Sequence, residues 1–181
     1  MPLHKPSHPP HHDPHLPGRF PHPPEDIWAI TLRSAQATER LGRAIGHQLR
    51  GGEIIALTGE LGAGKTVLTK GMAAALGISP EQVTSPTFTL IHEHAGHPRL
   101  VHADLYRISH LEELRSLGFE EYSDPSTVVV IEWADRMGTE LPQDCLAVHL
   151  AHAKRYHRLA TVKAHGPLSR ALLKRIRTEK D

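Results

Sequence analysis

A glycine-rich segment with the sequence GELGAGKT, at residues 59–66, constrains the fold of this chain more than any other feature. The apolar run EIIALT at residues 53–58 precedes it and is typical of a buried strand. A helical pattern over residues 65–76 follows, and Gly77 ends it. The segment matches the pattern G-x-x-x-x-G-K-[ST], in which the turn between a strand and a helix binds phosphate. We therefore predict an α/β domain built around a phosphate-binding loop.

Each residue type in this loop has a physical role. Glycines let the backbone wrap tightly, so that successive N–H groups point at phosphate oxygens. The helix that begins at about Lys65 directs the positive end of its dipole to the same place. We expect Lys65 to contact the β- and γ-phosphates of a nucleotide and the Thr66 hydroxyl to bind Mg²⁺.

Periodicity and turn signals predict strands interleaved with helices along the rest of the chain. Further strands are expected at residues 27–32, 87–93, 100–104, 128–132, 146–150 and 159–162. Helices are expected at residues 34–49, with Ser34 as N-cap, at 112–117 and at 168–177, with Leu168, Leu172 and Ile176 facing inward. This order predicts a P-loop NTPase-like three-layer α/β sandwich with a mixed, mainly parallel central sheet.

Two acidic residues end predicted strands. Asp104 follows LVHA at residues 100–103, and Glu132 follows VVVI at residues 128–131. Carboxyl ends of parallel strands meet the ligand in open α/β sheets, and a P-loop needs an acidic partner for its metal. Our hypothesis is that one carboxylate holds Mg²⁺ and the other holds or orients water. Ordinary strand-end carboxylates are the alternative interpretation.

Composition narrows the class of protein. Apolar residues make up 39% of the 181 residues, and no apolar run approaches the roughly 20 residues of a bilayer span. The start lacks the pattern of a signal peptide. Cys145 is the only cysteine, which excludes an intrachain disulfide and a thiolate metal cluster. The net charge of +1 gives no general attraction to nucleic acid. We expect a cytoplasmic protein.

Proline and histidine dominate residues 1–24, where nine prolines accompany six histidines, namely His4, His8, His11, His12, His15 and His22. Few apolar side chains are present to bury, so this segment is expected to be a disordered tail beside an ATPase domain at residues 25–181. Clustered imidazoles also chelate transition metals, although the spacing here matches no defined site.

The nucleotide base is indicated by what the sequence lacks. GTPases of this class usually read guanine with an Asn-Lys-x-Asp motif, and this chain contains no asparagine. Adenine is therefore favoured. Trp133 either stacks on the base or fills the core. The segment SPT at residues 85–87 either senses the γ-phosphate through a hydroxyl or forms a turn that enters a strand.

Four ordered motifs resemble the TsaE (YjeE) family: GELGAGKT, SPTFTL from Ser85, HADLYR from His102 and IEW from Ile131. The resemblance covers about residues 34–166. It implies an ATPase of the tRNA threonylcarbamoyladenosine pathway. Such proteins act with the TsaB–TsaD pair, which transfers a threonylcarbamoyl group to the adenosine just after the anticodon in tRNAs that read ANN codons. ATP hydrolysis sustains turnover of that complex, and tRNA is a partner only through it.

The resemblance also implies roles for particular residues. Catalysis would use Lys65, Asp104 and Glu132, and Mg²⁺ would be held by Thr66 and Glu132. Nucleotide contacts would come from Ala35, Leu61, Gly62, Ala63, Gly64, Lys65, Thr66, Thr87, Trp133 and Arg155. Arg158 lies in the same arginine-containing stretch as Arg155, and either one reaches the nucleotide or both are surface charges. The tail is not part of the family pattern, and Glu60 stands where many members have aspartate.

Three other functions remain open at this point. A metal-delivery GTPase can pair a His-rich tail with a P-loop, but the missing guanine motif and the single cysteine count against it. A small-molecule kinase needs a lid that excludes water, and only Arg107 and Arg115 suggest one. The third is a non-catalytic, nucleotide-switched binding module. It overlaps with the TsaE interpretation, because slow hydrolysis and control by a partner are expected of a small P-loop protein.

Overall fold

The computed structural model describes residues 26–178 except 117, 123 and 155, so the predicted tail lies outside the described residues. The strands are β1 (Ile27–Leu32), β2 (Ile54–Thr58), β3 (Ile91–His94), β4 (Arg99–Asp104), β5 (Thr127–Glu132), β6 (Leu146–His152) and β7 (Arg158–Ala164). The helices are α1 (Ala35–Gly46), α2 (Lys65–Ala75), α3 (Leu111–Ser116) and α4 (Pro167–Thr178), with 3₁₀ segments η1 (Phe119–Tyr122) and η2 (Ala134–Glu140).

The strands form one seven-stranded sheet in the order β1-β7-β6-β2-β5-β4-β3. The central pairs β6–β2, β2–β5 and β5–β4 are parallel. The outer pairs β1–β7, β7–β6 and β4–β3 are antiparallel. All the strands except β7 and β3 therefore run in one direction. The predicted α/β fold with a mixed, mainly parallel sheet is confirmed.

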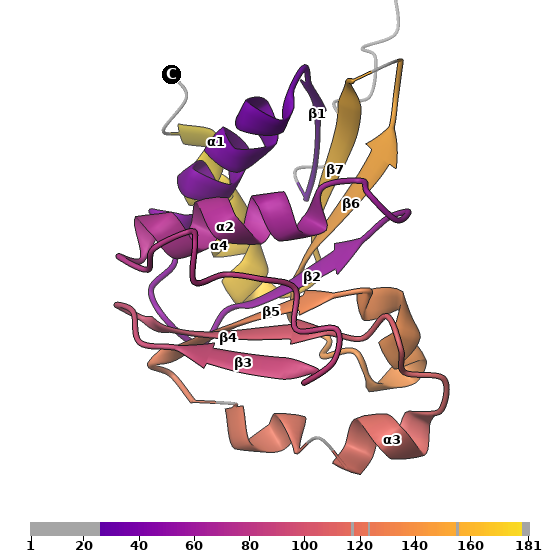
Figure 1. The fold of residues 1–181 in the computed structure, drawn as a ribbon. Coiled ribbons are helices and arrows are strands. Elements are labelled where there is room, and N and C mark those ends of the chain that lie inside the picture. Colours follow the sequence, from indigo (N-terminus) through magenta and orange to yellow (C-terminus); the bar gives the residue numbers. More distant parts are fainter. Residues whose placement is uncertain (1–25, 117, 123, 155, 179–181) are drawn as a thin grey trace, which may run out of the picture.

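Helices cover the sheet unequally. Helices α1, α2 and α4 lie together on one side of it (Figure 1) and bury the larger core, which includes Ile45, Leu68 and Leu172. On the other side, η2 and the chain after β4 cover the central strands through Ala134 and Met137. Every residue of β5 is buried, since this strand is covered on both faces.

Most predicted elements are present within a few residues. Ser34 caps α1 as predicted, because its side chain accepts a hydrogen bond from the backbone N–H of Ala37 at 3.1 Å. The helix ends at Gly46, earlier than the predicted residue 49.

None of the described helices has the length and apolar character that crossing a membrane requires.

The predicted strand at residues 87–93 is wrong over its first half. The backbone turns before β3, with Leu90 at a φ of 67°, and the Leu90 N–H bonds to the Pro86 carbonyl at 2.6 Å. This left-handed conformation interrupts an extended strand, so pairing with β4 starts only at Ile91.

The predicted inward position of Leu168 is also wrong, because this side chain is 40% exposed. The buried stripe of α4 instead contains Ser169, Leu172, Leu173 and Ile176. Asp144 accepts the backbone N–H of Leu168 at 2.8 Å and that of Ser169 at 2.9 Å. This cap sets the rotation of the first turn and leaves Leu168 at the side of the helix.

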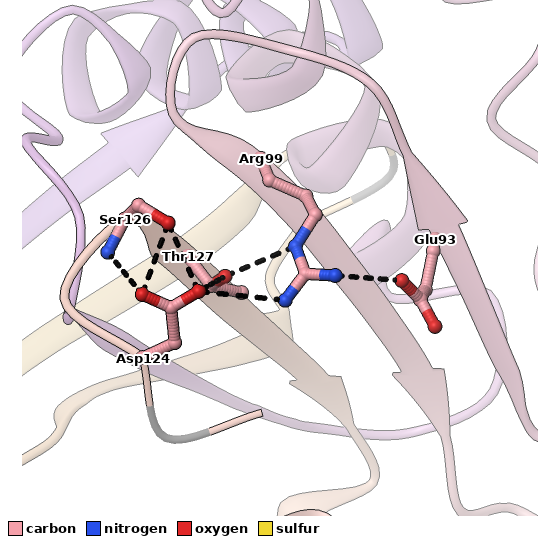
Figure 2. A network of polar contacts seen from close by, with 5 residues as sticks. All are labelled: Glu93, Arg99, Asp124, Ser126 and Thr127. Carbon is pink, nitrogen blue, oxygen red and sulfur yellow. Dashed lines mark hydrogen bonds and ion pairs between the residues drawn. The ribbon is translucent and has the colours of Figure 1, made fainter. Parts of the chain in front are cut away.

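A polar network braces the edge of the sheet at the amino end of β5 (Figure 2). Arg99 donates to Thr127 at 3.1 Å and to Glu93 at 3.0 Å, and it lies 3.6 Å from Asp124. The backbone N–H of Ser126 bonds to Asp124 and lowers the pKa of that carboxyl. The charged side chains of Arg99, Glu93 and Asp124 are exposed, so their ion pairs contribute little stability, but they join the β3–β4 hairpin to the loop before β5.

Helices α1 and α2 approach each other closely at glycines. A Cβ added at Gly42 would lie 2.2 Å from the Leu68 carbonyl oxygen, and one added at Gly71 would lie 2.2 Å from that of Glu39. Real Cβ atoms do not approach backbone this closely, so both positions require glycine. The contact places α1 against α2, the helix that begins at the phosphate-binding loop.

We predict that Gly42→Ala and Gly71→Ala each destabilise the fold by about 1–3 kcal/mol, because the new methyl group overpacks the helix contact. Alanine is otherwise the better helix former by about 1 kcal/mol, so intrinsic propensity acts in the opposite direction. Urea unfolding followed by circular dichroism measures the change, with Gln36→Ala on the exposed face of α1 as control. An unchanged or raised unfolding midpoint in the glycine variants contradicts the prediction.

Candidate nucleotide-binding site

The phosphate-binding loop, residues 59–66, joins β2 to α2 as the sequence predicts. Gly59, Gly62 and Gly64 have φ values of 131°, 76° and 109°, which L side chains rarely adopt. A Cβ at Gly59 would also lie 2.1 Å from the Leu150 carbonyl oxygen. Gly64 is the N-cap residue of α2, so the helix amino end faces the loop.

Lys65 is buried and folded back onto its own loop. Its Nζ donates to the carbonyl oxygens of Gly59 at 2.7 Å and Glu60 at 3.0 Å, and it lies 3.7 Å from the centre of the Trp133 ring. Burial lowers the pKa of the Lys65 ammonium, and carboxylates that include Glu132 partly oppose the shift. A phosphate oxygen is a stronger acceptor than a carbonyl, so a bound nucleotide could replace these contacts.

Glu132 connects the loop to the sheet. It ends β5, is paired in register with Leu57 of β2 and Asp104 of β4, and is almost fully buried. Its Oε2 accepts a hydrogen bond from the Thr66 hydroxyl at 3.0 Å, and its Oε1 lies 2.9 Å from His102 Nε2. The two residues predicted to hold Mg²⁺ are therefore in direct contact.

Asp104 ends β4 and organises the segment after α2. Its Oδ2 accepts hydrogen bonds from the Thr87 hydroxyl at 2.9 Å and from the Ser85 hydroxyl, and its Oδ1 accepts the Tyr106 N–H at 2.9 Å. Thr87 thus lies beside a predicted catalytic carboxylate, although it lies in a turn and not in the predicted strand. A group that competes for Asp104 would release both hydroxyls.

The donor set suits a hard cation such as magnesium. Thr66 and Glu132 offer oxygen ligands, and Mg²⁺ is usually bound through one or two carboxylates with substrate phosphates and water completing the octahedron. Within the part of the chain that the structure describes, no group of three or more His, Cys, Asp or Glu side chains is arranged to hold a metal. A protein-only metal site is absent there, whereas an ion shared with a nucleotide phosphate suits these two residues.

Trp133 lies between the core and the site. Its ring packs against the smaller core, lies under Lys65, and contacts the Tyr106 ring at a centroid distance of 5.0 Å. Its φ of 59° and ψ of 40° are unusual for a bulky residue, and such strain is concentrated at functional sites. The two interpretations of Trp133, core residue and neighbour of the nucleotide, are therefore compatible.

Arg158 forms part of the outer wall of the loop. From β7 it donates to the carbonyl oxygens of Ala63 at 3.3 Å and Gly62 at 3.4 Å. Arg155, which the sequence favoured for a nucleotide contact, lies outside the described residues. Leu61 is 74% exposed at the tip of the loop.

Ala35 lies in the first turn of α1 with an exposed side chain. A Cβ added at Gly64 would lie 3.5 Å from the Thr38 methyl group of the same turn. The start of α1 therefore borders the phosphate-binding loop, but no contact of Ala35 with the other site residues is described.

Sequence reasoning assigned no role to His102, although it contacts Glu132. A signal was present, because His102 is the only polar residue in the run LVHA, and a polar residue inside a buried strand requires a partner. The contact of Arg158 with loop carbonyls had no comparable signal, since it depends on where β7 pairs.

Comparisons with known proteins agree with this geometry. Residues 32–160 match the family model for the threonylcarbamoyl adenosine biosynthesis protein TsaE. The chain is 43% identical over 118 residues to the tRNA threonylcarbamoyladenosine biosynthesis protein TsaE of Treponema pallidum, which covers 65% of this chain and 87% of the relative. The protein of the same name from Bacillus subtilis is 37% identical over 132 residues, covering 72% and 82% respectively.

A solved structure has the same fold. The crystal structure of Bacillus subtilis YdiB superposes with a TM-score of 0.72 at 29% identity and covers 86% of this chain and 97% of that one. The family-model match over residues 32–160 contains the phosphate-binding loop, Asp104, Glu132 and the four motifs that resemble the family. The chain therefore belongs to the TsaE family of tRNA threonylcarbamoyladenosine biosynthesis proteins.

Proposed function

We propose that this chain binds ATP with Mg²⁺ and hydrolyses it in the service of tRNA threonylcarbamoyladenosine formation. The observation that carries the proposal is the 3.0 Å hydrogen bond from the Thr66 hydroxyl, at the end of the phosphate-binding loop, to the Glu132 carboxylate. The absence of asparagine, and hence of the usual guanine motif, favours ATP over GTP. Residues 61–66 bind the phosphates in this proposal, and Thr87 and Trp133 border them.

In this mechanism the protein stabilises charge that develops on the transferred phosphoryl group. Lys65 leaves the Gly59 and Glu60 carbonyls and binds the β- and γ-phosphate oxygens, while the loop N–H groups hold the remaining oxygens. Thr66 and Glu132 would hold Mg²⁺, which supplies further neutralisation of phosphate charge. Asp104 orients the attacking water or the outer shell of the metal, once Ser85 and Thr87 no longer occupy it.

The proposal includes a protein partner that docks over the nucleotide. The most exposed large apolar side chains among the described residues are Phe88 at 88%, Tyr156 at 78% and Leu61 at 74%. All three are close in sequence to residues of the site: Leu61 is in the loop, Phe88 follows the Thr87 that bonds to Asp104, and the Tyr156 carbonyl accepts a hydrogen bond from Arg158, which also bonds to loop carbonyls. Apolar side chains exposed on one rim indicate a protein interface. We assign it to the TsaB–TsaD pair acting on tRNAs that read ANN codons.

Two further expectations belong to the same proposal. We place the protein in the cytoplasm, where tRNA modification takes place. We treat the His/Pro-rich residues 1–24 as a tail attached to the ATPase domain. The metal-delivery GTPase remains the alternative outcome of the experiments below.

Phosphate release from ATP and from GTP tests the reaction. We expect weak ATP turnover by the chain alone, which rises when purified TsaB–TsaD is added, and little turnover of GTP. Glu132→Gln and Asp104→Asn should each lower the stimulated rate about 100-fold or more, because each removes a charge needed at the transferring phosphate. The exposed Glu112→Gln in α3 serves as control. A preference for GTP, or full activity in both variants, contradicts the proposal.

Substitution of the apolar rim tests the docking surface. Phe88→Ser and Tyr156→Ser should weaken stimulation by TsaB–TsaD about tenfold, because each removes a contact residue at the interface. Turnover without partner should be unchanged. Leu168→Ser is the matched control. Leu168 is an exposed leucine of α4 next to Gly52, which precedes β2, whereas the phosphate-binding loop follows the other end of β2. Equal loss of stimulation in all three variants would contradict docking over the nucleotide.

A further inference from the structure

His102 is a fully buried imidazole on β4, the strand between β5 and the edge strand β3. It is paired with Val130 of β5 and His92 of β3, and its neighbours along the strand, Leu100, Val101 and Ala103, are apolar and buried. Its Nε2 is 2.9 Å from Glu132 Oε1, and both side chains are shielded from solvent. The contact therefore involves a carboxylate that already accepts a hydrogen bond from Thr66.

The hydrogen-bond pattern defines the role of each ring nitrogen. An ionised carboxylate only accepts, so Nε2 must carry the proton and donate to Glu132. The other nitrogen, Nδ1, is buried and has no partner among the described residues. An unpaired buried polar atom costs stability, which an apolar residue at this position would avoid. The imidazole is thus retained at a cost, and the donor to Glu132 is the only interaction described that offsets it.

The geometry divides the work of the two carboxylate oxygens. The Nε2 atom of His102 bonds to Oε1 of Glu132, and the Thr66 hydroxyl bonds to Oε2 at 3.0 Å. A glutamate side chain has several rotatable bonds, and a donor to one oxygen fixes the direction of the other. Partners of this kind orient metal ligands, and their loss typically weakens metal affinity about 10–100-fold.

We propose that His102 is a positioning residue that holds the Glu132 carboxylate with Oε2 turned toward Thr66, the orientation in which these two residues would hold Mg²⁺. The inference rests on the proposed function, since it concerns the metal of that site. It assigns to the histidine of HADLYR a role separate from the aspartate of the same motif: His102 acts through Glu132, whereas Asp104 contacts Ser85 and Thr87.

The test measures metal binding without turnover. Fluorescent mant-ADP is bound to the full chain, and Mg²⁺ is titrated from an EDTA-buffered solution. We expect His102→Leu to raise the Mg²⁺ concentration for half-maximal effect about tenfold or more, with mant-ADP affinity in EDTA unchanged. His102→Gln should retain a midpoint close to that of the wild type, because its amide can donate to Glu132.

The matched control is His94→Leu. His94 lies on the adjacent strand β3, its Nε2 also lacks a partner among the described residues, and no contact with Glu132 is described. In the Glu132→Gln background, His102→Leu should add no further change, because the two residues act through one contact. Should His102→Leu fail to fold, His102→Met replaces it as a flexible apolar variant and is compared with His102→Gln.

The outcomes separate this inference from the function on which it rests. If the wild-type chain binds no mant-ADP, or Mg²⁺ has no effect on binding, the proposed function and the inference both fail. If the wild type responds to Mg²⁺ and the apolar His102 variants keep its midpoint, the inference alone is overturned. The same holds if His94→Leu shifts the midpoint equally, since the effect would then be general to the β3–β4 pair.

Discussion

The site depends on the two hydrogen bonds that the buried Glu132 carboxylate makes. The carboxylate receives Thr66 from the helix that follows the phosphate-binding loop and His102 from the neighbouring strand, so one buried charge joins α2, β4 and β5. An ionised carboxylate without partners in the core would be strongly destabilising. The fold tolerates it because the parallel strands β2, β5 and β4 end at the same edge of the sheet, where donors from adjoining elements converge.

The remainder of the structure holds this edge in place. The close contact of Gly42 and Gly71 sets α1 against α2, and Arg158 supports the loop from β7 through its carbonyl oxygens. At the end of β4, Asp104 accepts hydrogen bonds from the hydroxyls of Ser85 and Thr87. Lys65 and Asp104 both have partners within the protein: the Gly59 and Glu60 carbonyls for Lys65, and the Ser85 and Thr87 hydroxyls for Asp104. In the proposed function, binding of a nucleotide would exchange these contacts for contacts with phosphate.

Sequence patterns predicted the fold well where local and tertiary preferences agree. The buried strand before the loop, the helix that begins at Lys65 and the cap at Ser34 are all present, since each depends on neighbouring residues. Predictions were wrong where contacts with distant residues accompany the backbone conformation: Leu168 is capped by Asp144, and the carbonyl of the left-handed Leu90 accepts the backbone N–H of Asp104 at 3.0 Å. No local pattern contains either partner.

By itself the sequence determined the family, the phosphate-binding loop and the two strand-end carboxylates, because glycine spacing and apolar runs express local backbone requirements. Only the tertiary structure decided that Glu132 meets Thr66 and His102, whereas Asp104 meets Ser85 and Thr87. The order of strands in the sheet determines these pairings. Strand order depends on packing between segments far apart in the chain, and a single sequence carries no direct sign of it.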